Sequence, residues 1–161
     1  MEIHADSVNF IILGAGEVKT QEALVALKEQ FPNQYSAFIG YDESLAHLVY
    51  AGSDFLLMPS RVEPCGLNQM YSMRYGTLPM VRVTGGLKDT VIDFGDEGGY
   101  GIRFLQATAA DIVQSVSRAV EVYANTALLQ LLRKRMMALD FSWDRSAKEY
   151  IDLYQSLNPA I

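Results

Sequence analysis

The sequence has one cysteine, few basic side chains and no long apolar run, and each shortage excludes a class of protein. Its single cysteine, Cys65, cannot form an internal disulfide, which is consistent with a reducing cytoplasm. Its 13 lysines and arginines stand against 19 aspartates and glutamates, and the net charge of −6 argues against nucleic acid or an anionic membrane as a partner. No apolar run approaches the roughly 20 residues that cross a bilayer, and no signal peptide is visible. We therefore expect a cytoplasmic protein.

Five short apolar runs alternate with helical patterns along the 161 residues, which amount to one domain. This alternation predicts an α/β fold, a right-handed doubly wound parallel sheet with buried strands. The last predicted helix has an apolar side that either packs locally or stays exposed, in which case self-association is favoured. The predicted strands are 8–13, 35–39, 55–58, 78–83 and 102–104, and the predicted helices are 20–31, 44–52, 67–75, 87 onward, 109–123, 127–139 and 143–157.

Glycine-containing turns follow the strands 55–58 and 78–83, and they carry the candidate site. The first turn leads into the helix 67–75, and the second, Thr84-Gly85-Gly86, opens the next helix. Because the carboxyl ends of parallel strands meet at one edge of a sheet, two helix N-termini should point into one crevice. Their unpaired N–H groups favour phosphate, and glycines at both turns would let a pyrophosphate approach the backbone.

Glu63 in the first turn does not fit a phosphate site, because its carboxylate repels phosphate. It is better suited to accept hydrogen bonds from sugar hydroxyls, so we interpret the crevice as a nucleotide-sugar site. A salt bridge between Glu63 and Arg61 is the structural alternative. Cys65 has no histidine near it in the sequence, so a small residue lining a tight turn is favoured over a catalytic thiol.

Three segments resemble the family of bacterial glycogen synthases and plant starch synthases: EPCGLNQMY (63–71), YGTLP (75–79) and TGGLKDTV (84–91). The likeness extends to FSW at 141–143. It implies a retaining glycosyltransferase that transfers glucose from ADP-glucose, or UDP-glucose, to the 4-hydroxyl at the non-reducing end of an α-1,4-glucan. It also implies the GT-B fold, in which two Rossmann-like domains flank the active site, and residues 1–161 resemble the C-terminal nucleotide-sugar-binding domain.

The resemblance implies roles for single residues. Glu63 would orient the glucose through its 3- and 4-hydroxyls and would not act as an acid or base. Tyr41 would stack on the adenine, with a tyrosine that merely covers a loop as the alternative. Tyr71 stands eight residues after Glu63, where broader members of this fold carry a second glutamate and the synthases do not. The implied substrate-binding residues are Tyr41, Glu63, Cys65, Gly66, Leu67, Asn68, Thr84, Gly85 and Gly86.

The resemblance also implies that parts of the enzyme lie outside this chain. These are the N-terminal acceptor domain, the first strand of the present domain and a cation pair that holds the donor phosphates. The chain alone is therefore expected to be inactive, to have an open sheet edge, and to meet the α-glucan only through the missing domain. We expect a nucleotide-sugar substrate, with no cofactor and no metal. The alternatives are a stand-alone nucleotide-binding regulatory module and a sucrose- or trehalose-type glucosyltransferase.

For several charged residues outside the two turns, a structural role is the alternative to a role in ligand binding. His47 lacks neighbours at metal-ligand spacing and is expected to be structural. Arg82 and Lys88 are either cations near the phosphates or surface charges. The basic run 133–135 is expected to be exposed, and the acidic loop 91–101 to be a solvated turn.

Overall fold

The computed structural model describes residues 8–157, and every strand and helix predicted from the sequence is present with boundaries shifted by no more than two residues. In chain order the elements are β1 (Phe10–Gly14), α1 (Val18–Gln30), β2 (Tyr35–Ile39), α2 (Glu43–Gly52), β3 (Phe55–Met58), α3 (Asn68–Tyr75), β4 (Leu78–Arg82), α4 (Gly85–Thr90), β5 (Ile102–Phe104), α5 (Ala109–Ala124), α6 (Thr126–Met137) and α7 (Trp143–Leu157).

Polar residues and one glycine set the ends of several helices. The Asp42 carboxylate accepts from the Leu45 N–H at 2.9 Å at the start of α2, and Thr108 caps α5 through the N–H of Asp111 at 3.3 Å. These bonds satisfy N–H groups that have no partner within the helix. Gly76 ends α3 with a φ of 83°, a left-handed conformation that glycine adopts without steric cost.

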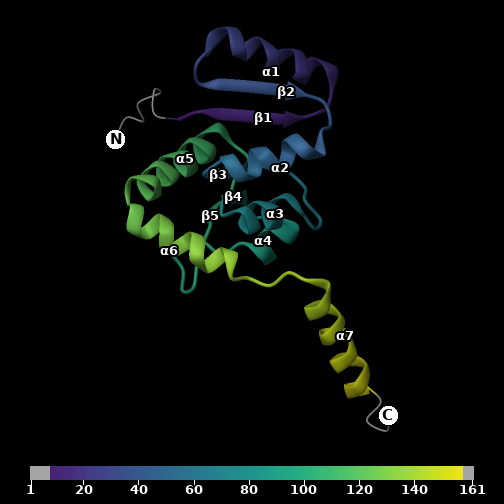
Figure 1. The fold of residues 1–161 in the computed structure, drawn as a ribbon. Helices are drawn as coiled ribbons and strands as arrows, with labels where there is room; N and C mark the ends of the chain where they lie inside the picture. Colours follow the sequence, from purple (N-terminus) through teal and green to yellow (C-terminus); the bar gives the residue numbers. More distant parts are fainter. Residues whose placement is uncertain (1–7, 158–161) are drawn as a thin grey trace.

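The strands are all parallel, which confirms the α/β class, but they form two sheets and not the single sheet predicted. One sheet pairs β1 with β2, and the other has the order β3-β4-β5. Figure 1 shows the β1–α1–β2 unit above the β3–β4–β5 sheet, with α2 leading from one to the other. Within residues 8–157, β1 and β3 each keep an edge that no strand pairs.

The prediction that the strands are buried is wrong for β1 and β2, in which no residue is buried. In β1, Phe10 is 43% and Ile11 is 56% exposed, and α1 has no buried residue. The reason is that a parallel strand is buried only when neighbouring strands and helices cover it on every side. Within residues 8–157, β1 and β2 pair only with each other, and α1 packs against β2, so their apolar residues remain in contact with solvent.

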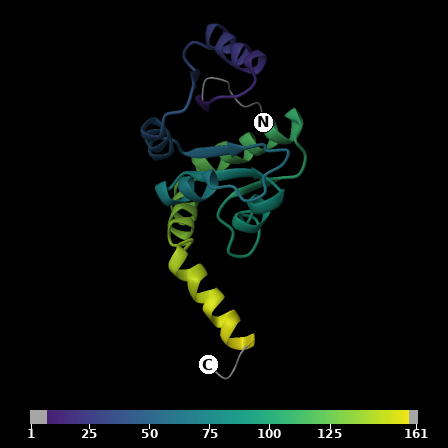
Figure 2. The same cartoon turned by 90° about the vertical axis from the view of Figure 1, so that its right-hand side faces the viewer.

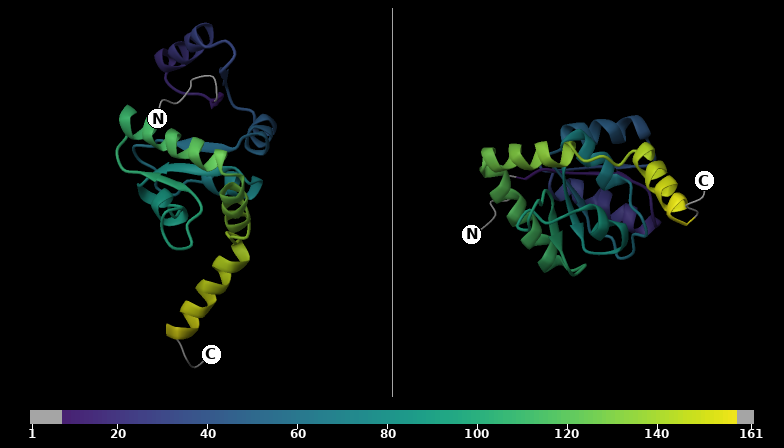
Figure 3. Two further views of the ribbon diagram at one scale, coloured as in Figure 1. Left: turned by 90° about the vertical axis from the view of Figure 1, so that its left-hand side faces the viewer. Right: turned by 90° about the horizontal axis from the view of Figure 1, so that it is seen from below.

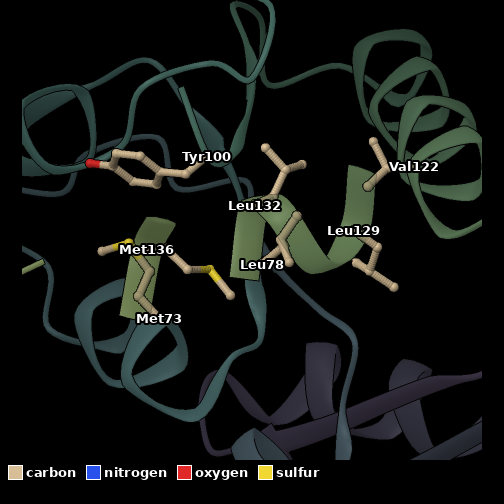
Figure 4. Packing of buried hydrophobic residues seen from close by; sticks show 7 residues of the cluster. All are labelled: Met73, Leu78, Tyr100, Val122, Leu129, Leu132 and Met136. Carbon is tan, nitrogen blue, oxygen red and sulfur yellow. The ribbon is translucent and has the colours of Figure 1, made fainter. Parts of the chain in front are cut away.

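The core lies around β4, the central strand of the three-stranded sheet. Four of its five residues are buried, since β3 and β5 pair with both edges and helices cover it. On one side, seven side chains from α3, β4, α5, α6 and the loop before β5 pack together (Figure 4). They are Met73, Leu78, Tyr100, Val122, Leu129, Leu132 and Met136.

Helix α7 extends away from the rest of the molecule, at the end opposite the β1–α1–β2 unit (Figures 2 and 3). None of its residues is buried, and Trp143 is 86% and Tyr154 is 65% exposed. Of the two predicted alternatives, the exposed apolar side is therefore correct. Among the residues described, no helix combines the length and apolarity needed to cross a membrane.

The basic run on α6 is not simply exposed, as the sequence predicted. Arg133 is half-buried, and its guanidinium bonds the Asp54 carboxylate at 2.7 Å and the Gly76 carbonyl at 3.0 Å. Arg135 donates to the carbonyl of Gly99 at 3.2 Å. Both arginines thus tie α6 to loops around the core. Lys134 and Arg135 are exposed as predicted, and Arg133 is not.

Candidate functional site

The first glycine turn runs from the end of β3 to the start of α3. Gly66 has a φ of 75°, and a Cβ at this position would lie 2.6 Å from the Gln69 side-chain oxygen, so the turn requires glycine. Leu67 precedes the helix, which begins at Asn68. In the described part of the chain, the backbone N–H groups of Gly66, Leu67 and Asn68 donate no hydrogen bond. They are the donors expected to bind an anion at this end of α3.

The second glycine turn packs directly against the first. A Cβ on Gly85 would lie 1.9 Å from the carbonyl oxygen of Glu63, and a Cβ on Gly86 would lie 1.8 Å from that of Cys65. The Gly86 N–H donates to the carbonyls of Glu63 at 3.1 Å and Pro64 at 3.2 Å. The two turns are therefore joined as predicted from the parallel strands, and glycine is required because the backbones touch.

Because of this contact, the second turn has fewer free N–H groups that could bind a ligand. The Gly86 N–H is already bonded to the first turn, so it is not a free donor for a phosphate. Helix α4 begins at Gly85, with Thr84 as its N-cap, and has only six residues, so it contributes a short dipole. The second turn therefore supports the first through Gly86, while the N–H groups of Thr84 and Gly85 donate no hydrogen bond within residues 8–157.

Glu63 is half-buried and its carboxylate accepts from the Ser60 hydroxyl at 3.1 Å. The alternative of a salt bridge to Arg61 is wrong, since no such ion pair is found within residues 8–157. The Ser60 hydroxyl therefore orients the carboxylate. Its other oxygen has no partner among the described residues, so the group can still accept hydrogen bonds.

Arg82 has a role that the sequence did not reveal. Its guanidinium donates to the Ser60 carbonyl at 2.7 Å and to the Arg61 carbonyl at 2.5 Å, and a longer bond of 3.5 Å reaches Leu105. It is thus neither a free surface charge nor a free phosphate ligand. The sequence feature that could have pointed to this role is the position of Arg82 at the end of β4, beside the turn that follows the neighbouring strand β3.

Two predicted site residues have few contacts. Tyr41 follows β2, in the other sheet, and is 88% exposed. Among the described residues, no hydrogen bond or ring contact joins it to the Glu63 turn. Cys65 is a free, exposed thiol beside Gly86, and its carbonyl makes the close approach described above. The structure thus brings together the residues of the two turns and leaves Tyr41 apart.

An aromatic group between α2 and α3 lies outside these turns. The Nδ1 atom of His47 is 2.9 Å from the Tyr75 hydroxyl, and the rings of Tyr50 and Tyr75 stack with centroids 6.3 Å apart. Burial, together with the charge of Tyr71, raises the pKa of Tyr50. His47 therefore links two helices, in line with the structural role expected for it.

The acidic loop before β5 is a turn whose tip, with Asp96 and Glu97, is exposed as predicted, whereas Asp93 is half-buried and holds the loop in place. Both Asp93 oxygens accept from the Arg118 guanidinium, at 2.6 and 2.9 Å, and they also accept from the N–H groups of Gly95 and Arg103. Arg118 in turn lies 4.6 Å above the Phe94 ring. Burial raises the pKa of Asp93, but these hydrogen bonds and the arginine charge outweigh it, so the pKa lies below its usual value.

We expect Asp93→Asn to lower stability at neutral pH by roughly 2 kcal/mol, because Arg118 loses its carboxylate in a partly buried position. A lowered folded-state pKa contributes stability that is complete above the ordinary pKa of about 3.9 and is lost as the pH falls through the folded-state pKa. Urea unfolding at pH 7 and pH 3 should therefore show a smaller acid effect in the variant. Glu149→Gln, which breaks the exposed 3.0 Å pair with Arg145, is the control and should change little. An equal acid effect in Asp93→Asn and the parent would contradict this role.

A parallel α/β domain with two joined glycine turns at the carboxyl ends of adjacent strands is typical of proteins that bind ligands at this edge of the sheet. Residues 2–127 match the model of the family described as glycosyl transferases group 1, and the chain belongs to this family.

Curated relatives are glycogen synthases. That of Flavobacterium johnsoniae is 54% identical over 151 residues, covering 94% of this chain and 32% of the relative, and that of Kosmotoga olearia is 45% identical over 156 residues, covering 96% and 33%. Among solved structures, the catalytic domain of starch synthase IV from Arabidopsis thaliana, bound to ADP and acarbose, matches with a TM-score of 0.82 and 36% identity over 92% of this chain and 32% of that one. The chain thus spans about a third of the length of these relatives.

Proposed function

We propose that the chain is the donor-binding part of a glycogen or starch synthase, which transfers glucose from ADP-glucose, or UDP-glucose, to the non-reducing end of an α-1,4-glucan. The observation that carries this proposal is the contact between the two glycine turns. It fixes the turn that carries both the Glu63 carboxylate and three backbone N–H groups with no partner within residues 8–157. A carboxylate accepts hydrogen bonds from sugar hydroxyls, and backbone N–H groups donate hydrogen bonds to a diphosphate. One short segment therefore has groups that bind both halves of a nucleotide sugar.

In this proposal the chain contributes orientation and electrostatic stabilisation. The N–H groups of Gly66, Leu67 and Asn68 bind the diphosphate and stabilise the charge that develops on it as the bond to glucose breaks. Glu63, oriented by Ser60, accepts hydrogen bonds from the glucose hydroxyls and holds the ring in place. Cys65 lies against the sugar and Tyr41 stacks on the base. No step needs a cofactor or a metal.

We further propose that a longer polypeptide completes the enzyme. The free edges of β1 and β3 are suited to a further parallel strand between them, which would join the two sheets into one. An acceptor domain would provide the α-glucan site, and the segment just upstream of this chain would provide the cations that hold the donor phosphates. The chain alone is therefore expected to be inactive, and the whole enzyme to be cytoplasmic. The relatives' length, about three times that of this chain, supports this arrangement.

Donor binding can be tested by titrating the isotope-labelled chain with ADP and following its amide resonances by NMR. We expect weak binding, with a dissociation constant of about 1 mM, because free backbone donors without added cations supply a modest free energy. The shifts should concentrate at Gly66, Leu67 and Asn68, with a smaller change at Tyr41. Adenosine, which lacks phosphate, is the control and should leave the three turn residues unchanged. Spectra that do not change at 10-fold this concentration of ADP would show that the turn is no phosphate site.

A further inference from the structure

Gln69, in the first turn of α3, is a polar side chain with no exposure to solvent. Its amide nitrogen donates to the Gly66 carbonyl at 2.9 Å, with a longer contact of 3.4 Å to the Cys65 carbonyl. The same nitrogen also donates to the Thr90 hydroxyl at 3.0 Å, at the far end of α4. One amide therefore bridges the first glycine turn and the helix that carries the second.

The orientation of this amide follows from its partners. The Thr90 hydroxyl gives its proton to the Gly86 carbonyl at 2.6 Å, so towards Gln69 it can only accept. All the groups around the nitrogen are then acceptors, and the nitrogen must face them. The Gln69 oxygen consequently points away, and it is buried without a partner in the part of the chain that the structure describes.

A buried acceptor without a donor destabilises the folded state, because its hydration is lost and not replaced. A methionine of similar volume would fill the same space and remove the unpartnered oxygen, but it would leave the Gly66 carbonyl without its donor. Gln69 is therefore poorly explained by packing alone. What it provides, and methionine cannot, is a pair of N–H donors that connect the two turns.

The connection continues beyond Thr90. The Thr90 carbonyl accepts from the Tyr100 hydroxyl at 2.8 Å, and Tyr100 belongs to the buried cluster around β4. Gly86, whose carbonyl receives the Thr90 proton, is the residue whose N–H holds the Glu63 and Pro64 carbonyls. A line of hydrogen bonds thus runs from the core through Thr90 to both sides of the Glu63 turn.

We propose that Gln69 is a positioning residue for the donor site: its amide holds the Glu63–Gly66 turn at a set distance from α4. This keeps the Glu63 carboxylate and the free N–H groups of the turn in one geometry, so that the sugar and the diphosphate are bound together. The inference rests on the proposed function, since it assigns Gln69 a part in the same site. It predicts that the bridge matters more for ligand binding than for folding.

The test compares variants of the 161-residue chain in the ADP titration and in thermal unfolding. Gln69→Met should weaken ADP binding by roughly tenfold, the effect of misplacing binding groups by a fraction of an ångström. The melting temperature should change little, because removal of the unpartnered oxygen offsets the loss of the donor to the Gly66 carbonyl. Ser72→Ala is the matched control, because Ser72 is equally buried in α3 and its hydroxyl bonds only the Gln69 carbonyl at 2.9 Å. It should leave ADP binding unchanged.

Variants of Thr90 test the same bridge from its other end. They test the positioning role of Gln69 even if Gln69→Met does not fold. Thr90→Val removes the partner on α4 and should weaken binding to a similar extent, and Thr90→Ser, which keeps the hydroxyl, should bind as the parent does. Combined with Gln69→Met, Thr90→Val should add little, because both remove one bridge. A parent chain that does not bind ADP would refute the donor site itself. A parent that binds, with Gln69→Met or Thr90→Val binding equally well, would refute the positioning role alone.

Discussion

The Gly86→Ala chain should melt far below the parent and bind no ADP. An alanine Cβ at this position would lie 1.8 Å from the Cys65 carbonyl oxygen and 2.5 Å from its carbon, distances at which atoms overlap. The obstructing atoms are backbone, so no side-chain rotation relieves the clash, and the two turns must separate. We expect a loss of about 3 kcal/mol or more, in the range of severe overpacking. Separation would also break the bonds from the Gly86 N–H to the first turn.

Gly52→Ala is the matched control for this prediction. Gly52 is the last residue of α2, and a Cβ there would meet nothing within 4 Å. Alanine has the higher helix propensity, so this variant should be as stable as the parent or more stable by up to about 1 kcal/mol. Both variants can be compared by thermal unfolding and by the ADP titration. A Gly86→Ala chain with the parent's melting temperature would mean that the turns are not in contact.

Glu63→Ala should have the largest effect on glucosyl transfer, measured in a hybrid enzyme. The hybrid is the Flavobacterium johnsoniae glycogen synthase with its matching third replaced by this chain, which is 54% identical to it over 151 residues. We expect the hybrid to incorporate glucose from ADP-glucose into glycogen. Removing Glu63 should lower kcat/KM by about 100-fold or more, since hydrogen bonds from sugar hydroxyls to a charged group contribute about 1.5–3 kcal/mol each.

Two further variants of the hybrid locate the effect. Ser60→Ala frees the carboxylate by removing its 3.1 Å hydrogen bond and should cost roughly tenfold, a typical result of a less well-oriented group. Glu97→Ala removes an exposed carboxylate in the loop before β5 and should leave the rate unchanged. If Glu63→Ala transferred glucose as fast as Glu97→Ala, the assignment of Glu63 would be wrong. A folded hybrid without any transfer would contradict the proposed function of the chain.

The elements were predictable because their signals are local. The strands 35–39, 55–58 and 102–104 and the helix 143–157 have the predicted boundaries, since apolar runs, caps and glycine stops act over a few residues. The juxtaposition of the two turns was also predictable, because parallel strands bring their carboxyl ends to one edge. The start of α4 was placed two residues late, at Leu87 and not at Gly85, because glycines weaken the helical pattern there.

The pairing of charged and polar side chains was not predictable. Arg133 meets Asp54 across 79 positions, and Asp93 meets Arg118 across 25, so neither pattern is visible in a short window. Arg82 was left as a cation of undecided role, and Gln69 was not singled out, although both support the Glu63 turn. Their partners are mostly backbone carbonyls, which every residue has, and so they leave no signature in the sequence.

The order of strands, helices and glycine turns, and with it the family and the position of the candidate site, was determined by the sequence alone, because backbone propensity and turn chemistry act between neighbouring residues. Only the tertiary structure decided that the strands form two sheets, that β1 and α7 leave their apolar faces uncovered, and that Gly86 serves to let backbones touch. These outcomes depend on which distant segments meet and on what is there to cover them. Such contacts are a property of the packed chain and of no single stretch of it.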